Sequence, residues 1–323
     1  MIETIASVGL PVDETLKIKK NRLEPEDGGN GRRISIVTGI HGDELEGQYV
    51  CFELLRRIEQ QREHLRGTVD VYPGMNPLGI DSITRGFPAF DLDMNRLFPG
   101  SKDGDMMEFL ASRMIGDLCG SDACVDIHAS NIFLREIPQV RINEQHAKKL
   151  IPLAKRLNVD YIWVHSSSTV LESTLAYSLN SRNVPTLVVE MGVGMRITKE
   201  YCDQLTDGLF CLMKTLGIWD GQVKEPREPI VSQDGKVCFL NAATSGIFVP
   251  ETDHWKNLEK GDLVGRILDP LRGEVLDEIH SPVTGILFTL REYPVVDEGS
   301  LIARGLNCKD PEEKRYKEGD WKA

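Results

Sequence analysis

Short apolar runs alternate with amphipathic stretches along the first two thirds of the chain. The runs are rich in β-branched residues and lie at 34–40, 68–72, 123–127, 161–164 and 186–189. Such runs are typical of strands in a sheet that is covered on both faces. Between them, apolar residues recur near a period of 3.6, which predicts helices over 44–61, 105–118 and 199–216. The alternation predicts an α/β fold with a mostly parallel mixed sheet flanked by helices.

The pattern changes near Gly221. A polar segment with two prolines, 221–229, is expected to be a linker, and short strands and turns follow it. Segments 245–267 and 281–305 share one order of small, apolar and polar positions and both close on an apolar strand. This weak internal repeat predicts a small β domain with two similar halves. We therefore expect an α/β domain over 1–220, a β domain over 228–308 and a charged surface tail over 309–323.

The composition is that of a folded globular protein, since 41% of the residues are hydrophobic and 27% are charged. The net charge of −12 makes the chain a poor candidate for nucleic-acid binding. No apolar run approaches the roughly 18–20 residues of a membrane helix, and the N-terminus does not resemble a signal peptide. We therefore expect a cytoplasmic protein with no nucleic-acid or membrane partner. The seven cysteines form no CxxC pair and are expected to be buried, reduced thiols.

A candidate metal site begins where the run at 34–40 ends. His41 and Glu44 stand in a Gly-rich turn between that predicted strand and the next helix. The carboxyl end of a parallel strand is where α/β proteins place their sites, and imidazole nitrogen and carboxylate oxygen both suit Zn²⁺. Taken alone, this spacing equally fits a helix-capping acid beside a structural histidine. It is not the helical HExxH pattern, because no second histidine lies four residues on.

A third ligand is available from another strand end. His128 directly follows the run at 123–127, so it is expected to meet His41 and Glu44 above the sheet. Two histidines and one glutamate leave a fourth position open, as catalytic zinc sites require. Asp126 lies two residues earlier on the same strand face, where it would orient a ligand or stay ionised beside the site.

Acid–base and cationic groups complete the candidate site. Glu190 follows four apolar residues, and a carboxylate there is costly to bury without a task, so we expect a general base or a salt-bridged structural acid. Asn95 and Arg96 stand together between apolar residues and are suited to hold a carboxylate. Arg85 is expected either to reach a developing oxyanion beside the metal or to be a solvated surface residue.

The order of these motifs resembles the succinylglutamate desuccinylase/aspartoacylase family, which has a zinc-carboxypeptidase-like fold. The resemblance covers most of residues 30–195 and rests on HxxE, NP, TR, DLxxNRxFPG, DxH and a strand-end Glu, in that order. It implies one Zn²⁺ per chain. It implies the following roles: zinc ligands His41, Glu44 and His128; general base or acid Glu190; substrate-carboxylate residues Asn95 and Arg96; oxyanion-stabilising Arg85.

Two departures from the family pattern concern the residues near Asn95. The spacing from Arg85 to Asn95 is longer than in aspartoacylase. The family's DLNR is replaced by a longer segment here, so either Asp91 or Asp93 takes the position of the family's aspartate.

The C-terminal part resembles a barrel-sandwich domain, similar to lipoyl or biotinyl carriers. Those carriers present a lysine in a central hairpin, and the corresponding stretch 268–282 contains none, which argues against a swinging-arm carrier. In the desuccinylase-like family such a domain partly covers the zinc cleft. Which of its residues line the cleft, and whether Arg135 or Arg141 contacts substrate, is left open by the sequence.

The leading hypothesis is a zinc-dependent amidohydrolase that removes an acetyl or succinyl group from an N-acyl amino acid. The alternative is a zinc carboxypeptidase acting on short peptides. A third hypothesis, a zinc-stabilised binding protein without catalysis, leaves Glu190 and the Asn95–Arg96 pair without a purpose. The acyl group and the amino acid are not specified by the sequence, and a homodimer is the default expectation for the oligomeric state.

Overall fold

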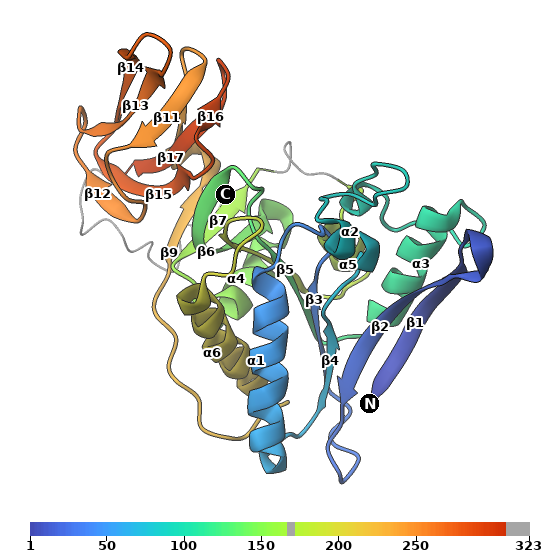
Figure 1. Ribbon diagram of the computed structural model, residues 1–323. Coiled ribbons are helices and arrows are strands. Elements are labelled where there is room, and N and C mark those ends of the chain that lie inside the picture. The colour runs from blue at the N-terminus through green and yellow to red at the C-terminus, as the bar shows by residue number, and fades with distance from the viewer. Residues whose placement is uncertain (167–171, 308–323) are drawn as a thin grey trace.

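The computed structural model describes residues 1–166 and 172–307. At its centre lie four parallel strands that neighbour one another across the main sheet (Figure 1). In sheet order they are β4 (Thr68–Tyr72), β3 (Arg33–Thr38), β5 (Ala123–His128) and β8 (Thr186–Gly192). All four were predicted, and the predicted α/β class with a mixed sheet is confirmed.

Five further strands extend the main sheet on its two sides, and the apolar runs predict only some of them. On one side an antiparallel hairpin pairs with β4. On the other side a long strand runs antiparallel to β8 and is followed by two parallel partners. These elements are β1 (Ile2–Gly9), β2 (Thr15–Leu23), β6 (Leu134–Asn143), β7 (Tyr161–His165) and β9 (Ile230–Gln233). Of these five, only β7 was predicted, because β1, β2 and β6 interleave polar and apolar residues.

Helices cover both faces of the sheet. α1 (Glu46–Gln60) and α6 (Lys199–Thr215) lie side by side on one face, where α4 (Ala147–Ala154) joins them. On the other face α3 (Met106–Leu118) and α5 (Leu175–Asn180) share a second apolar cluster with the N-terminal hairpin. Each long helix lies within two residues of its predicted limits. Asp105 caps α3 by accepting hydrogen bonds from the backbone N–H groups of Met107 and Glu108.

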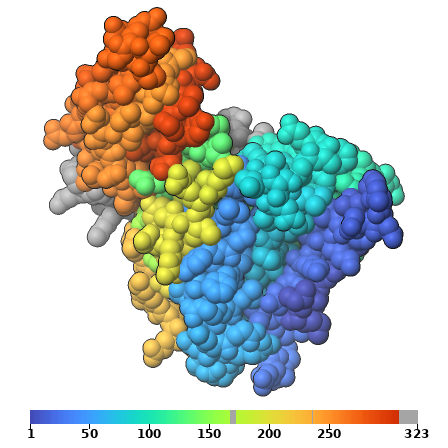
Figure 2. All heavy atoms as spheres, in the orientation of Figure 1, coloured from blue at the N-terminus to red at the C-terminus, as the bar shows by residue number. Residues whose placement is uncertain are grey.

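The C-terminal strands form a β sandwich at one end of the molecule (Figure 2). One sheet has the order β14-β13-β11-β16, and β15, β17 and β10 continue the main sheet through a ladder between β15 and β6. A third apolar cluster lies between the two sheets. The strands are β10 (Val237–Asn241), β11 (Gly246–Pro250), β12 (Lys256–Leu258), β13 (Leu263–Asp269), β14 (Glu274–His280), β15 (Gly285–Arg291), β16 (Val295–Val296) and β17 (Leu301–Asn307).

The two similar sequence segments form equivalent sets of strands. Within the first segment β11 pairs with β13, and within the second β15 pairs with β17. The short strand of each segment pairs with the other segment, since β12 pairs with β15 and β16 pairs with β11. The segment 268–282 without lysine forms the β13–β14 hairpin. The domain limits 1–220 and 228–308 stay a prediction, and the predicted tail 309–323 lies outside the described residues. Over 1–166 and 172–307, no helix is long and apolar enough to cross a membrane.

Candidate active site

The turn between β3 and α1 carries His41 and Glu44, and backbone contacts hold its shape. Gly39 has a φ of +69°, which side-chain-bearing residues rarely adopt. The N–H of Gly42 donates to the carbonyl of Arg85, and a Cβ at Gly42 would lie 2.0 Å from the carbonyl carbon of Gly79. The turn therefore packs against the segment that carries Arg85, and only a glycine fits at this contact.

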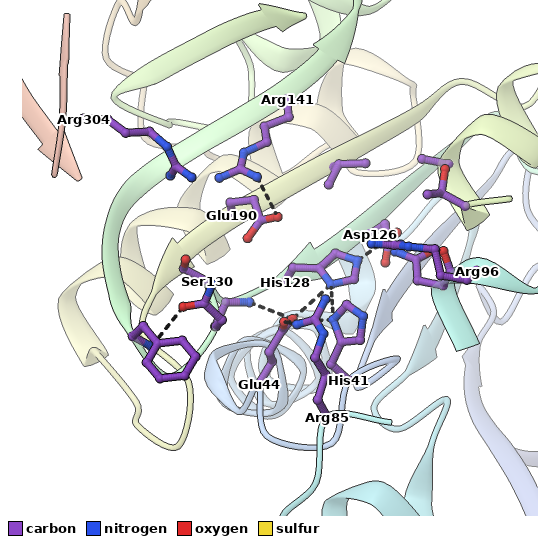
Figure 3. A pocket seen from close by; sticks show the side chains of 17 residues that line it. His41, Glu44, Arg85, Arg96, Asp126, His128, Ser130, Arg141, Glu190 and Arg304 are labelled. Carbon is purple, nitrogen blue, oxygen red and sulfur yellow. Dashed lines mark hydrogen bonds and ion pairs between the residues drawn. The ribbon is translucent and has the colours of Figure 1, made fainter. Parts of the chain in front are cut away.

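The three predicted ligands converge as expected (Figure 3). The Nδ1 atom of His41 lies 2.8 Å from Oε1 of Glu44, and Nδ1 of His128 lies 3.0 Å from Oε2 of the same carboxylate. The two Nδ1 atoms are 3.3 Å apart. All three side chains are buried.

The outer nitrogens of both imidazoles also face carboxylates. Nε2 of His41 lies 3.1 Å from Oδ1 of Asp93, and Nε2 of His128 lies 3.1 Å from Oδ2 of Asp126, although the second contact lacks hydrogen-bond geometry. If each of these nitrogens carried a proton toward its carboxylate, both rings would be imidazolium cations. Their Nδ1 atoms lie 3.3 Å apart, so the two cations would repel each other. If Nδ1 of each histidine bound a metal ion instead, neither ring would need two protons, and each Nε2–H would face an aspartate, the usual arrangement around metal-bound histidines. The donor set therefore fits a metal ion.

The charges around the cluster point the same way. Burial raises the pKa of Glu44, but hydrogen bonds and charges from His128 and His41 more than reverse this and hold it below its ordinary value. Burial lowers the pKa of His128, and the charges of Asp126 and Glu44 outweigh that, so it is raised. The carboxylates of Glu44, Asp93 and Asp126 therefore favour positive charge on or between the two histidines. Either protons on the imidazoles or a metal ion would provide this charge.

Arg85 lies beside the cluster of His41, Glu44 and His128. Its Nη1 donates to Oε1 of Glu44 at 3.0 Å, and its Nη2 is 3.6 Å from Oδ2 of Asp93. The side chain is 41% exposed, so the guanidinium borders both the ligand cluster and the cavity. Arg85 is thus both partly solvated and paired with Glu44, and its role toward an oxyanion stays a prediction.

Asn95 and Arg96 lie on a single 3₁₀ turn, Met94–Arg96, that lines the same cavity. The side-chain oxygen of Asn95 accepts from the N–H of Leu175 at 2.9 Å, which leaves the amide nitrogen to donate to a ligand. Nη1 of Arg96 donates to the carbonyl of Asn95, and Nη2 is 3.8 Å from Asp93. Both groups thus present donors to the cavity, as carboxylate binding requires.

Glu190 is the direct neighbour of His128 across the β5–β8 ladder. Its Oε1 lies 3.4 Å from Nη1 of Arg141, and its side chain is 16% exposed. Burial raises the pKa of Glu190, and the charges of Arg141 and His128 only partly oppose this. A carboxyl group with a raised pKa beside a candidate metal site is typical of an acid–base catalyst.

Comparisons with known proteins decide the family. A sequence profile described as "Succinylglutamate desuccinylase/Aspartoacylase catalytic domain" matches residues 30–216. The chain belongs to this family. The resemblance inferred from the motifs is thereby confirmed.

Known proteins also match most of the chain in sequence and in fold. The N-alpha-acetyl-L-2,4-diaminobutyric acid deacetylase of Halomonas elongata is 24% identical over 283 residues, which cover 85% of this chain and 82% of that protein. A succinylglutamate desuccinylase/aspartoacylase structure from Rhodobacter sphaeroides has a TM-score of 0.80 at 21% identity and covers 96% of both chains. The product-bound ectoine utilization protein EutE (DoeB) of Ruegeria pomeroyi has a TM-score of 0.80 at 20% identity, over 94% of this chain and 93% of that chain.

The candidate site of this desuccinylase/aspartoacylase-family chain lies in a cavity of about 620 Å³. The sequence left the role of one lining residue, Arg141, open and did not indicate another, Arg304. Arg141 lines the cavity, whereas Arg135 is absent from its described lining and hydrogen-bonds to His254 at 3.0 Å. Arg304 of β17 is the lining residue that comes from the C-terminal strands. Beneath both arginines lies Glu136, which is fully buried. In the sequence, only the pattern R-x-I-x-x-V-R that ends at Arg141 pointed to an arginine near the site. No motif around Arg304 indicated that it lines the cavity.

Proposed function

We propose that this chain is a zinc-dependent amidohydrolase that removes the acyl group from an N-acyl amino acid. The observation that carries the proposal is one cavity lined by a His–Glu–His cluster, the largely buried carboxyl group of Glu190 and four arginines. The cluster supplies two nitrogens and a carboxylate, the ligand set of many catalytic zinc sites.

His41, Glu44 and His128 would hold the ion. Bound zinc acts as a Lewis acid toward a carbonyl and lowers the pKa of water. Asp93 and Asp126 fix the imidazole orientation from the outer side.

Glu190 would carry the proton through the reaction. It accepts a proton from the attacking water as the new C–O bond forms, and it passes that proton to the amide nitrogen as the C–N bond breaks. The products are a carboxylic acid and a free amino acid. Arg85 donates to the negative charge that develops on the carbonyl oxygen.

Asn95 and Arg96 would hold the carboxylate of the amino acid. The named activity of the Halomonas elongata relative, deacetylation of an N-acetyl amino acid, supports this class of substrate. The carboxypeptidase alternative needs a cleft that admits a peptide, and Arg304 of the C-terminal strands borders the cavity from above. The position of Arg304 favours a small substrate. A cytoplasmic location and a homodimer stay predictions.

The test is hydrolysis of a panel of N-acetyl and N-succinyl amino acids and dipeptides by the zinc-loaded enzyme. Glu190→Gln is expected to keep its zinc and to lower kcat by about 10²–10⁴-fold. The matched control is Glu228→Gln, which changes an exposed acid paired with Lys155 and should leave kcat unchanged. Zinc bound without hydrolysis of any compound would favour the binding-protein hypothesis, and turnover of dipeptides alone would favour the carboxypeptidase.

A further inference from the structure

A second cavity, of about 390 Å³, adjoins the cavity that holds the His–Glu–His cluster. Both cavities are lined by Arg141, Thr174, Ala176 and Val188. Val188 lies two residues before Glu190 on β8, so their side chains are on the same face of the sheet. The second cavity therefore continues from the candidate active site along that face.

The wall between the two cavities contacts the turn that would hold the substrate's carboxylate. Oδ1 of Asn95 accepts from the N–H of Leu175 at 2.9 Å, and Leu175 stands between Thr174 and Ala176. A substrate carboxylate held by Asn95 and Arg96 would place the α-carbon next to this wall. The side chain on that carbon is then expected to enter the second cavity.

The second cavity combines an apolar lining with polar groups on two neighbouring strands. Asn143 of β6 is the direct neighbour of His165 of β7 across the parallel ladder, and Arg141 lies two residues before Asn143. The described lining contains no carboxylate. Its apolar side chains are those of Ile142, Leu150, Ala176, Tyr177 and Val188. This lining suits a side chain with an apolar stem and a polar end.

Three buried polar atoms of this lining have no hydrogen-bond partner among the described residues. They are Nε of Arg141, Nδ2 of Asn143 and Nε2 of His165. A buried polar atom without a partner destabilises a protein, and native structures contain few of them. A ligand that bonds to all three would remove this cost, so the chemistry of the three atoms indicates the chemistry of the ligand.

Two of the three atoms are donors. Oδ1 of Asn143 accepts from the N–H of Gln145 at 2.9 Å, which leaves the amide nitrogen as the unpaired end of the side chain. Nη2 of Arg141 lies 3.2 Å from Glu136 and Nη1 lies 3.4 Å from Glu190 (Figure 3). Its Nε–H is therefore the part of the guanidinium that is left for a ligand.

The third atom, Nε2 of His165, is an acceptor. Nδ1 of the same ring lies 3.1 Å from Oδ1 of Asp234, so the proton of the neutral imidazole belongs on Nδ1. Burial and the charge of Arg141 lower the pKa of His165 to about 4, although the contact with Asp234 opposes them. The ring is therefore neutral at pH 7 and has a lone pair on Nε2.

Two donors and one acceptor match the end of a carboxamide side chain. Its oxygen accepts two hydrogen bonds, and its nitrogen donates. A carboxylate has no proton to give to Nε2 of His165, so its charge would face a lone pair there. An ammonium group would face the two donors and the charge of Arg141. Both charged ends therefore fit less well than the carboxamide.

We propose that the second cavity binds the side chain of the substrate's amino acid and prefers an uncharged side chain that ends in a carboxamide. Glutamine is the simplest probe of this class. The inference rests on the proposed function and adds to it the kind of amino acid that is released. The preference differs from that named for the Halomonas elongata relative, whose amino acid is 2,4-diaminobutyric acid.

The experiment compares the N-acyl forms of glutamine, homoleucine, glutamate and 2,4-diaminobutyrate near neutral pH, each with the acyl group that the zinc-loaded enzyme hydrolyses best. Homoleucine has the shape of glutamine, with two methyl groups in place of the amide oxygen and nitrogen. We expect kcat/KM for the glutamine compound to exceed that for each of the others by about 10²-fold, because the others leave buried polar atoms unpaired.

Asn143→Asp keeps the oxygen that accepts from Gln145 and replaces the donor with an acceptor. It should lower the glutamine-to-homoleucine ratio at least tenfold. His165→Phe, which removes the acceptor, should lower the ratio as well and serves if the first variant does not fold. The control is Asn257→Asp, which changes an exposed asparagine of β12 outside the described lining of both cavities. Its ratio should match that of the unmodified enzyme.

Several results would overturn the side-chain site while the amidohydrolase stands. They are equal kcat/KM for the glutamine and homoleucine compounds, equal or faster turnover of the glutamate or diaminobutyrate compound, and a ratio that Asn143→Asp and His165→Phe both leave unchanged.

A binding measurement separates this inference from the proposed function. In the Glu190→Gln background, calorimetry gives Kd values for N-acetylglutamine and N-acetylhomoleucine without turnover. Tighter binding of the glutamine compound, lost in Glu190→Gln/Asn143→Asp, supports the side-chain site even if the enzyme hydrolyses none of the panel. Equal Kd values in the Glu190→Gln protein would count against it in either case.

Discussion

At the scale of single residues, the site depends on which imidazole nitrogen faces inward. Both predicted ligands of the histidine type, His41 and His128, turn Nδ1 toward Glu44 and Nε2 toward an aspartate. Asp93 has three contacts within the site. Its Oδ1 lies 3.1 Å from Nε2 of His41 and accepts from the N–H of Asn95, and its Oδ2 lies 3.6 Å from Arg85. It thus connects a predicted metal ligand, the predicted oxyanion residue and the predicted carboxylate-binding turn.

Asp93→Asn is expected to lower zinc affinity by about 10–100-fold, because an amide holds the His41 ring less firmly than a carboxylate does. Competition with a zinc chelator measures this affinity. The control is Asp91→Asn, since Asp91 is exposed and, among the described residues, forms no hydrogen bond or ion pair with His41, Glu44 or His128. Comparable losses in both variants would mean that charge near the turn, and not the contact with His41, determines zinc affinity.

At the scale of elements, strand ends and one tight turn bring the ligands together. β3, β5 and β8 are parallel neighbours, so the residues that follow or end them meet at the same edge of the sheet. The β3–α1 turn then folds back against α2 (Pro77–Ser82), where Gly42 meets the backbone of Gly79. The closeness of these two backbones fixes His41 and Glu44 with respect to Arg85.

Gly42→Ala is expected to lower the free energy of unfolding by about 3 kcal/mol and to reduce zinc binding, because the added Cβ forces the turn away from α2. Gly116→Ala offers the contrasting case. Gly116 lies within α3 and a Cβ there meets no atom within 4 Å, so the change should stabilise the protein by about 0.5–1 kcal/mol. Thermal unfolding and zinc content measured on both variants test the pair. Unaltered stability of Gly42→Ala would show that the turn has freedom to move.

At the scale of the whole molecule, the main sheet joins segments from both ends of the chain. β1 and β2 close it on one side, and β15 and β17 extend it on the other. A buried ion network attaches the N-terminal hairpin to the central strands. In it, Asp70 of β4 binds Arg22 through two hydrogen bonds of 2.8 Å and also pairs with Lys20 and Arg33.

Burial raises the pKa of Asp70, but the hydrogen bond from Arg22 and the charges of Lys20, Arg22 and Arg33 lower it below its ordinary value. Such a carboxyl group stabilises the fold above its unfolded pKa, and this contribution is lost as the pH falls through the folded pKa. Asp70→Asn should therefore cost about 3 kcal/mol at pH 7, because it leaves buried cations without their partner. The cost should begin to shrink below about pH 4, where the unfolded chain takes up a proton at Asp70, and should shrink further as the pH falls through the lowered pKa of the folded state.

Urea unfolding across this pH range measures the effect. Asp103→Asn changes an exposed acid in a loop and serves as the control. A destabilisation of Asp70→Asn that is the same at pH 7 and at low pH would assign it to packing instead of charge.

The sequence by itself determined the features that depend on neighbouring residues. Buried strands appear as apolar runs and helices as periodic ones, which is why β3, β4, β5, β7, β8 and the three long helices were predicted within a few residues. The metal-ligand candidates His41, Glu44 and His128 were found for a related reason, since polar residues at the ends of such runs are conspicuous.

Only the tertiary structure decided which distant residues share the cavity. Arg304 lies 168 residues from Glu136 in the chain, and its position depends on the β15–β17 and β15–β6 ladders. It also selected Asp93 over Asp91 as the partner of His41 and Arg141 over Arg135 as the cavity residue. Pairing between remote strands leaves no periodic signal in either strand alone, because the registers that join them are set by the packing of the whole sheet.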